Sequence, residues 1–211
     1  VFEADESNLF KPNAVTNYDL WEGGARASVG VSATAHIGSD LTLSTIVGRR
    51  WREDADPAFD DLSNLDQENS DYVASIRADM GRIVDVGARF RMDDELDINR
   101  VDIDANVNFW RIRGNARYFR LTQNALGAED EGLVWGGAFA VDDNWSAVVQ
   151  HARNITENED IRLSMGLRYQ DDCSFFQIAY ERSGGRDRTL GPSESIRFTF
   201  ALTGLGGATT N

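Results

Sequence analysis

Apolar and polar residues alternate along most of this chain, a pattern that indicates β-strands with one apolar and one polar face. The clearest run spans residues 25–37, where Ala, Val and Ile at odd positions alternate with Arg, Ser, Gly, Thr and His at even positions. This run is longer than the five or six residues typical of strands in soluble proteins. It fits the roughly 9–11 residues that a tilted strand needs to cross a bilayer.

The same alternation predicts ten further strands. We expect them at residues 41–51, 71–80, 83–91, 98–109, 111–121, 131–141, 145–153, 161–170, 174–182 and 195–203. In each segment one parity is apolar, as in Ile161, Leu163, Met165 and Leu167, and the other carries charged or amide side chains. Each strand therefore has one face suited to an apolar phase and one suited to water.

The connections between these strands alternate in length. Short turns at residues 38–40, 81–82, near 110, 142–144 and 171–173 take turns with longer connections at residues 52–70, 92–97, 122–130, 154–160 and 183–194. Transmembrane barrels have this rhythm, with short periplasmic turns and long outer loops. A soluble β-sandwich, the alternative, gives no reason to sort its loops by length. Aromatic residues near strand ends match the interfacial girdles of barrels: Trp51, Tyr72, Trp110, Trp135, Trp145, Tyr169 and Phe175.

Composition narrows the class of protein. The net charge of −14 and the single lysine, Lys11, argue against a nucleic-acid partner, which requires a basic face. Because the chain has no uncharged apolar run of about 18 residues, a spanning helix is excluded and a membrane protein of this pattern must be a barrel. We therefore predict an all-β fold, an antiparallel transmembrane β-barrel with about 11 strands here. Complete bacterial single-chain barrels have even strand numbers, so we expect this chain to be part of a larger barrel.

The polar parity predicts which charged side chains line the interior of such a barrel. Charges on the lipid side are costly, so charged residues of the polar parity are expected to face the water-filled lumen. Hydration and pairing with acidic neighbours such as Asp102 and Asp104 are the structural alternative to a role in transport for any one arginine. The residues predicted to face the lumen are Arg26, Arg89, Asp102, Asp104, Arg113, Arg117, Arg162 and Arg168.

Candidate chemistry is sparse. Asp102–Asn106 imitates the start of a calcium loop, but Val107 stands where that loop needs glycine. His36 and His151 have no ligand partner at metal-binding spacing, and no serine sits in a Gly-x-Ser-x-Gly elbow. The acidic connection at residues 52–71 could bind divalent cations, although a solvated loop is the better interpretation. We predict no catalytic set, no metal and no cofactor.

Two stretches resemble a known family. The first is Tyr18-Asp19-Leu20-Trp21-Glu22-Gly23-Gly24-Ala25-Arg26, with Leu9-Phe10 ahead of it. The second is the Asp171-Asp172-Cys173 turn with the aromatic strand ending Tyr180-Glu181-Arg182, followed by the segment from Ser195 to Gly206. Both resemble the LPS-assembly protein family LptD (OstA family), the second stretch being similar to the closing strands of its barrel.

The resemblance implies an outer-membrane translocon component of Gram-negative cells that inserts lipopolysaccharide into the outer leaflet through a polar lumen and a lateral gate. Because the first strand starts on the side of the long loops, residues 1–23 are expected to form an extracellular loop. Residues 24–203 are expected to be the C-terminal segment of the barrel, and residues 204–211 a periplasmic tail. The expected partners are lipopolysaccharide, outer-membrane lipid, an LptE-type plug lipoprotein, periplasmic LPS-bridge proteins that dock on an amino-terminal domain, and the barrel-assembly machinery. The gate is expected at the closing strand, composed of Ser195, Ile196, Arg197, Phe198, Thr199, Phe200, Ala201 and Leu202.

Cys173 is the one residue for which the resemblance implies a covalent role. It matches one of two adjacent cysteines that, in some members of the family, form disulfides with the periplasmic domain. The second position here is Ser174, so at most one such bond is implied. The short turn at residues 171–173 is expected in the oxidising periplasm, in agreement with a disulfide. A free buried thiol is the alternative.

Other barrels share the generic pattern. A general porin or another outer-membrane channel is the main alternative function, and an adhesin or secretion barrel is a third class. A periplasmic domain encoded upstream and a lipoprotein that co-purifies would favour LPS assembly, whereas diffusion of small solutes through the isolated protein would favour a porin.

Overall fold

The computed structural model describes residues 5, 7–11, 24–55, 59, 63, 65–123, 127–184 and 191–202. Within these residues the chain is all-β, with eleven strands and no α-helix. Over the same ranges no helix is long and apolar enough to span a membrane. The strands are β1 (Arg26–Ile37), β2 (Leu41–Arg52), β3 (Tyr72–Met80), β4 (Val84–Met92), β5 (Ile98–Phe109), β6 (Ile112–Leu121), β7 (Asp130–Ala140), β8 (Trp145–Asn154), β9 (Glu159–Gln170), β10 (Ser174–Ser183) and β11 (Ser193–Leu202).

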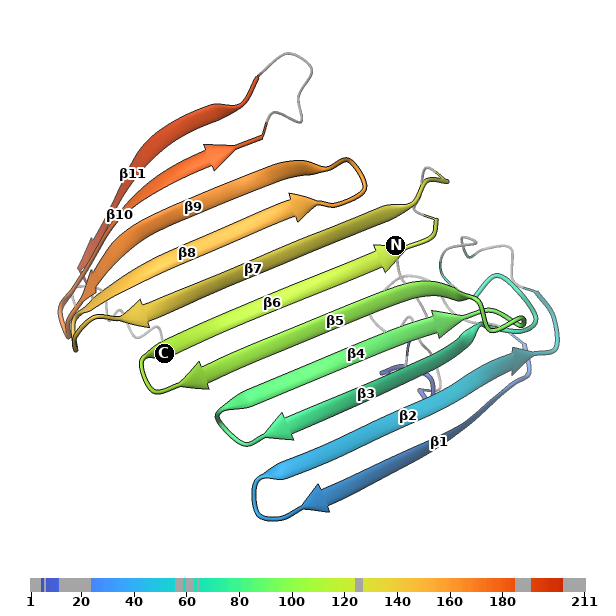
Figure 1. Cartoon of the computed structure of the whole chain (residues 1–211). Coiled ribbons are helices and arrows are strands. Elements are labelled where there is room, and N and C mark those ends of the chain that lie inside the picture. Colours follow the sequence, from blue (N-terminus) through green and yellow to red (C-terminus); the bar gives the residue numbers. More distant parts are fainter. Residues whose placement is uncertain are drawn as a thin grey trace, which may run out of the picture. The chain divides into compact units, whose positions relative to one another are not determined.

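The strands follow one another in the sheet in chain order, from β1 to β11 (Figure 1). Neighbouring strands, such as β1 with β2 and β10 with β11, pair antiparallel. All predicted strands are found, and the fold class predicted from the alternation is confirmed. Their ends differ by one or two residues; Ile83, for example, belongs to a turn because its N–H donates to the Met80 carbonyl at 3.1 Å.

The chain divides into two compact units. Unit 1 comprises Val1–Asp104 and Tyr118–Glu131, and unit 2 comprises Ala105–Arg117 and Gly132–Asn211. Unit 1 holds β1 to β4, and unit 2 holds β8 to β11.

Residues directly opposite one another in paired strands project to the same face, so the registers assign every side chain to a face. In unit 1, Val31 lies opposite Val47, and the adjacent Ser32 lies on the other face. In unit 2, Ile178 lies opposite both Leu167 and Phe198. Each unit therefore has one apolar face and one polar face, as the alternation predicts.

The apolar face is exposed. Val31 in unit 1 is 68% exposed and Phe198 in unit 2 is 66% exposed, and many other large apolar side chains of this parity are also exposed. Among the described residues the buried hydrophobic side chains are few: Leu9, Phe59, Leu65, Val73 and Ala179. A water-soluble sheet would bury its apolar parity instead, so this arrangement suits a surrounding apolar phase.

Glycines and aspartates stabilise the short turns of the hairpins. Gly38 and Gly81 adopt φ of 66° and 57°, a conformation that glycine adopts at little steric cost. In unit 2, the Asp142 carboxylate accepts hydrogen bonds from the backbone N–H groups of Asn144 and Trp145. Asp171 accepts hydrogen bonds from Cys173 and Ser174 in the same way. These aspartates hold their turns as Asx caps do.

Candidate functional site

The residues predicted to face the lumen all lie on the polar face of their strands. In unit 1, Arg26 lies opposite Arg52, Arg89 lies opposite Ser75, and the Asp104 carboxylate lies against Gly87. Asp102 shares the parity of Asp104. Whether this face lines a lumen stays a prediction.

In unit 2, strand register and side-chain contacts also place the predicted arginines on the polar face. Arg162 lies opposite Ala152, and Arg168 lies opposite Ser146 and Gln177. Arg113 and Arg117 share the parity of Asn115, whose Oδ1 faces Gly136 on the polar side of β7. Phe175 differs from its expected place among the girdle aromatics, because it lies opposite Gln170 on the polar face, with the Arg168 guanidinium 5.6 Å from its ring.

Several polar-face charges form ion pairs, within one strand or across strands. Asp102 pairs with Arg100 at 2.5 Å, within β5. Glu181 on β10 pairs with Arg162 on β9 at 2.9 Å and with Arg197 on β11 at 2.8 Å. The sequence pattern does not identify Glu181 as a bridge, because a bridge depends on the register of three strands.

Arg50 holds an amino-terminal segment against the polar face of unit 1. This strap consists of residues 7–11. Its Leu9 is only 2% exposed and reaches Gly48, where an added Cβ would lie 2.4 Å from Leu9 Cδ2. Arg50 Nη2 donates to the carbonyls of Asn8 at 3.0 Å, Leu9 at 2.7 Å and Lys11 at 3.2 Å. The segment therefore lies on the polar face near the long-loop end of β1 and β2.

A second contact covers the same end of unit 1. Arg52 Nη1 donates to the Leu65 carbonyl at 2.6 Å, and its guanidinium lies 5.3 Å from the Phe59 ring. Leu65 and Val73 are buried, as Leu9 is. The described part of the connection between β2 and β3 thus lies against the polar face. Neither Arg50 nor Arg52 was singled out by the sequence pattern.

Two clusters of polar groups lie on the apolar face, toward the long-loop ends of their strands. Arg49 lies opposite Val29, pairs with Asp94, and has its guanidinium 4.7 Å from the Tyr72 ring. In unit 2, Trp135 Nε1 donates to His151 Nδ1 at 3.1 Å, and His151 Nε2 lies 3.0 Å from Asp160 Oδ1. This aromatic and charged rim is the chemistry expected at a membrane interface.

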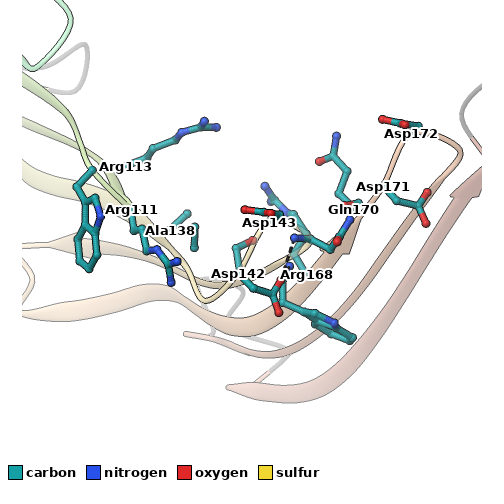
Figure 2. A pocket seen from close by; sticks show the side chains of 14 residues that line it. Arg111, Arg113, Ala138, Asp142, Asp143, Arg168, Gln170, Asp171 and Asp172 are labelled. Atoms are coloured by element: carbon teal, nitrogen blue, oxygen red, sulfur yellow. Dashed lines mark hydrogen bonds between the residues drawn. The ribbon is translucent and has the colours of Figure 1, made fainter.

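A hollow of about 650 Å³ opens at the short-turn end of unit 2 (Figure 2). We call it the short-turn hollow. It is lined by Trp110, Arg111, Arg113, Ala138, Ala140, Asp142, Asp143, Asn144, Trp145, Ser146, Arg168, Gln170, Asp171 and Asp172. Arg113 and Arg168, both predicted to face the lumen, are brought together here.

Two carboxylates of the short-turn hollow, those of Asp142 and Asp171, accept hydrogen bonds within the hairpin turns. The N–H groups of Trp145 and Asn144 lower the pKa of Asp142 below its ordinary value. The Cys173 N–H, followed by the Tyr169 hydroxyl and Ser174, lowers the pKa of Asp171. Both side chains therefore stay ionised near neutral pH and support their hairpins.

The arginines of the short-turn hollow differ in whether they have hydrogen-bond partners within the protein. Arg111 Nη1 donates to the Val141 carbonyl at 2.6 Å, and Arg168 Nε donates to Gln177 Oε1 at 3.2 Å. Arg113 is exposed and has no hydrogen-bond or ion-pair partner among the described residues. One guanidinium of the hollow is thus available to a ligand.

The remaining predicted residues are placed as follows. Cys173 is exposed and has a free thiol in the turn between β9 and β10. The residues predicted to form the closing strand lie in β11, whose Phe198 and Phe200 are on the apolar face and whose Arg197 and Thr199 are on the polar face. Among the described residues, no group of three or more His, Cys, Asp or Glu side chains is placed to hold a metal ion. Residues 12–23 of the predicted outer loop, residue 203 at the end of the predicted last strand, and residues 204–211 of the predicted tail lie outside the described residues.

Comparison with known proteins identifies the family. No curated protein matches this chain. A mutant of the Rh. blastica porin is similar among solved structures, at 10% identity and a TM-score of 0.42, over 81% of this chain and 78% of the porin chain. The model of the LptD family, described as LPS transport system D, matches residues 1–145, which include the first of the two familiar stretches and leave the second outside. Because this match extends over more than half of the chain, the chain belongs to the LptD family of the LPS transport system.

Proposed function

We propose that this chain is the C-terminal part of an outer-membrane translocon that inserts lipopolysaccharide into the outer leaflet, through a polar lumen and a lateral gate. Membership in the LptD family makes it an outer-membrane protein of LPS transport. The observation that carries the finer proposal is the pair of opposite faces, with exposed apolar side chains on one and arginines on the other.

Lipopolysaccharide is amphipathic, so its carrier must offer two environments. Sugars and phosphates need water and hydrogen-bond donors, which the polar face supplies through Arg26, Arg89, Arg113, Arg162 and Arg168. Acyl chains must leave into lipid, which touches the apolar face. A gate beside β11 would join the two environments, because β11 pairs with β10 alone among the described strands.

We further propose a location for each part of the chain and a set of partners. Residues 1–23 form an outer loop, residues 24–203 form barrel wall, and residues 204–211 lie in the periplasm. A plug lipoprotein occupies the lumen, bridge proteins deliver LPS to a periplasmic domain, and the barrel-assembly machinery inserts the chain. These partners are the ones that the family implies.

Cys173 is proposed to bond to that periplasmic domain. Its exposure in a short turn supports the proposal, because an exposed thiol can reach a partner cysteine. The masses of peptides from the native full-length polypeptide, reduced and unreduced, test it. A Cys173 peptide of unchanged mass in the unreduced sample would reject the bond.

The function is tested by depletion of the full-length protein in a Gram-negative host and re-expression from a plasmid. An LPS-specific antibody on intact cells should lose most of its binding after depletion and regain it after re-expression. Unchanged antibody binding, together with diffusion of small sugars into liposomes that contain the purified protein, would instead support a general porin.

A further inference from the structure

We propose that the short-turn hollow of unit 2 is a binding site for a phosphorylated saccharide, with the Arg113 guanidinium holding the phosphate. This inference deepens the proposed function and rests on it for the class of ligand. Its location and its binding groups come from the hollow itself.

The first argument is which polar groups remain available. Asp142 and Asp171 accept hydrogen bonds from their turns, and Arg111 donates to the Val141 carbonyl. Arg113 and Asp143 have no hydrogen-bond or ion-pair partner among the described residues. A guanidinium that donates in a planar fork is suited to phosphate oxygens, and a carboxylate that accepts is suited to sugar hydroxyls.

The second argument is space. Ala138, Ala140 and Ser146 contribute small side chains to the lining, and these leave a hollow of about 650 Å³. Pockets of roughly 300–1,000 Å³ accept ligands of drug size, a range that includes a disaccharide. Arg113, Asp143 and Gln170, which are labelled in Figure 2, all line this space.

The third argument is the aromatic rim. Trp110 is 78% exposed and adopts φ of 52°, in the left-handed region that bulky residues rarely occupy. The Arg111 guanidinium lies 5.4 Å from its ring. An exposed indole at the edge of a polar hollow offers an apolar surface on which the C–H face of a sugar ring can stack.

The mixed charge of the lining predicts selectivity. Four aspartates lie beside three arginines, so a bare inorganic anion gains little from the site as a whole. A ligand that carries both a phosphate and hydroxyls satisfies Arg113 and Asp143 together. We therefore expect the phosphorylated sugar to bind better than either inorganic phosphate or the unphosphorylated sugar.

The test is calorimetric titration of the full-length protein, stripped of bound lipid in detergent, with three soluble probes. These are a bis-phosphorylated glucosamine disaccharide without acyl chains, the same disaccharide without phosphates, and inorganic phosphate. Binding of the phosphorylated disaccharide should weaken at least tenfold in R113Q. W110A should weaken binding of the disaccharide with and without phosphates by the same factor.

The matched control is R182Q. Arg182 is also an exposed arginine of unit 2, but it lies near the long-loop end of β10, opposite Glu194 on the apolar face. R182Q should bind the phosphorylated disaccharide within twofold of wild type. Equal binding by R113Q and wild type, or inorganic phosphate binding as tightly as the phosphorylated disaccharide, would overturn the inference.

The antibody measurement on intact cells separates the two proposals. If LPS reaches the surface while R113Q binds the disaccharide as wild type does, the inference fails and the proposed function stands. If surface LPS is independent of the protein, the proposed function fails, whatever the hollow binds.

Discussion

At the scale of single residues, two glycines lie where the strap approaches the sheet. An added Cβ at Gly48 would lie 2.4 Å from Leu9 Cδ2 and 2.7 Å from the Val29 carbonyl oxygen. Gly30, opposite it, leaves the same kind of space for Phe10. The strap at residues 7–11 can therefore lie close to the sheet only because both positions lack a side chain.

We expect Gly48→Ala to displace the strap and to lower the free energy of unfolding by about 1–3 kcal/mol, the usual cost of overpacking. Hydrogen exchange at Lys11, whose N–H donates to the Asn8 carbonyl, should become faster. Gly191→Ala is the control, since nothing lies within 4 Å of its added Cβ. If Leu9 is the main obstacle, Leu9→Ala combined with Gly48→Ala should cost less than the sum of the two single changes; strict additivity would contradict this interpretation.

At the scale of elements, the hairpin turns of unit 2 depend on ionised aspartates. The folded-state pKa values of Asp142 and Asp171 are lowered by the N–H groups that donate to them. Groups of this kind stabilise the fold above the unfolded Asp value of about 3.9, and the contribution is lost as the pH falls through the lowered folded-state pKa. The turns should therefore be fully supported at neutral pH and weaken below about pH 4.

The double variant Asp142→Asn and Asp171→Asn should flatten this dependence. Its Tm at pH 7 should be lower than that of wild type, and the difference should shrink as the pH falls from about 4 towards 2. Asp40→Asn, in the turn between β1 and β2, is the control, because Asp40 accepts no hydrogen bond among the described residues. A difference in Tm between wild type and the double variant that does not change with pH would reject the role of these carboxylates.

The terminal strand β11 is tied to its neighbours through Glu181. Replacing this residue by Gln removes two ion pairs, with Arg162 and Arg197, which are each about half exposed. Exposed pairs contribute about 0.2–1 kcal/mol each, so Glu181→Gln should speed hydrogen exchange of β11 by severalfold and less so that of β9. Glu129→Gln, which removes the comparable pair with Arg120 in unit 1, should leave β11 unchanged. Equal exchange of β11 in both variants would show that Glu181 does not hold the strand.

At the scale of the whole molecule, the proposed transport depends on which face meets lipid. Val31 and Ser32 are neighbours in the middle of β1 and project to opposite faces. Both side chains are exposed, so exposure does not distinguish the face that meets lipid from the face that meets water. The surrounding phase makes the difference, since an arginine is tolerated in water and costly in hydrocarbon.

Val31→Arg should therefore destabilise the protein in bilayers by about 2–4 kcal/mol, the cost measured for arginine near the midplane of barrels. Ser32→Arg should cost much less, because its side chain reaches water. Unfolding in lipid vesicles, followed by tryptophan fluorescence, measures both. A larger loss for Ser32→Arg than for Val31→Arg would reverse the assignment of the two faces and remove the basis of the transport proposal.

The strands and their faces could be predicted from the sequence because side chains of a strand project alternately, so parity alone separates Val31 from Ser32. The alternation of short and long connections indicated which strands are joined by short turns. The two familiar stretches indicated the LptD family. The register could not be predicted to the residue, so contacts that depend on it, such as the ion pairs of Glu181 with Arg162 and Arg197, were not predicted. Phe175 is an error of a different kind, because it has the parity of Gln177 and Glu181 and was predicted among the girdle aromatics only from its position near a strand end.

The sequence by itself determined local geometry: where strands run, which parity is apolar, and which turns are short. Only the tertiary structure decided which residues from distant segments meet, because contacts between Arg50 and Leu9 or among Arg162, Glu181 and Arg197 need several strands aligned at once. The short-turn hollow is of the same kind. The alternation places Arg113 and Arg168 on the polar face of their strands. The pairing of strands then brings both residues to one site.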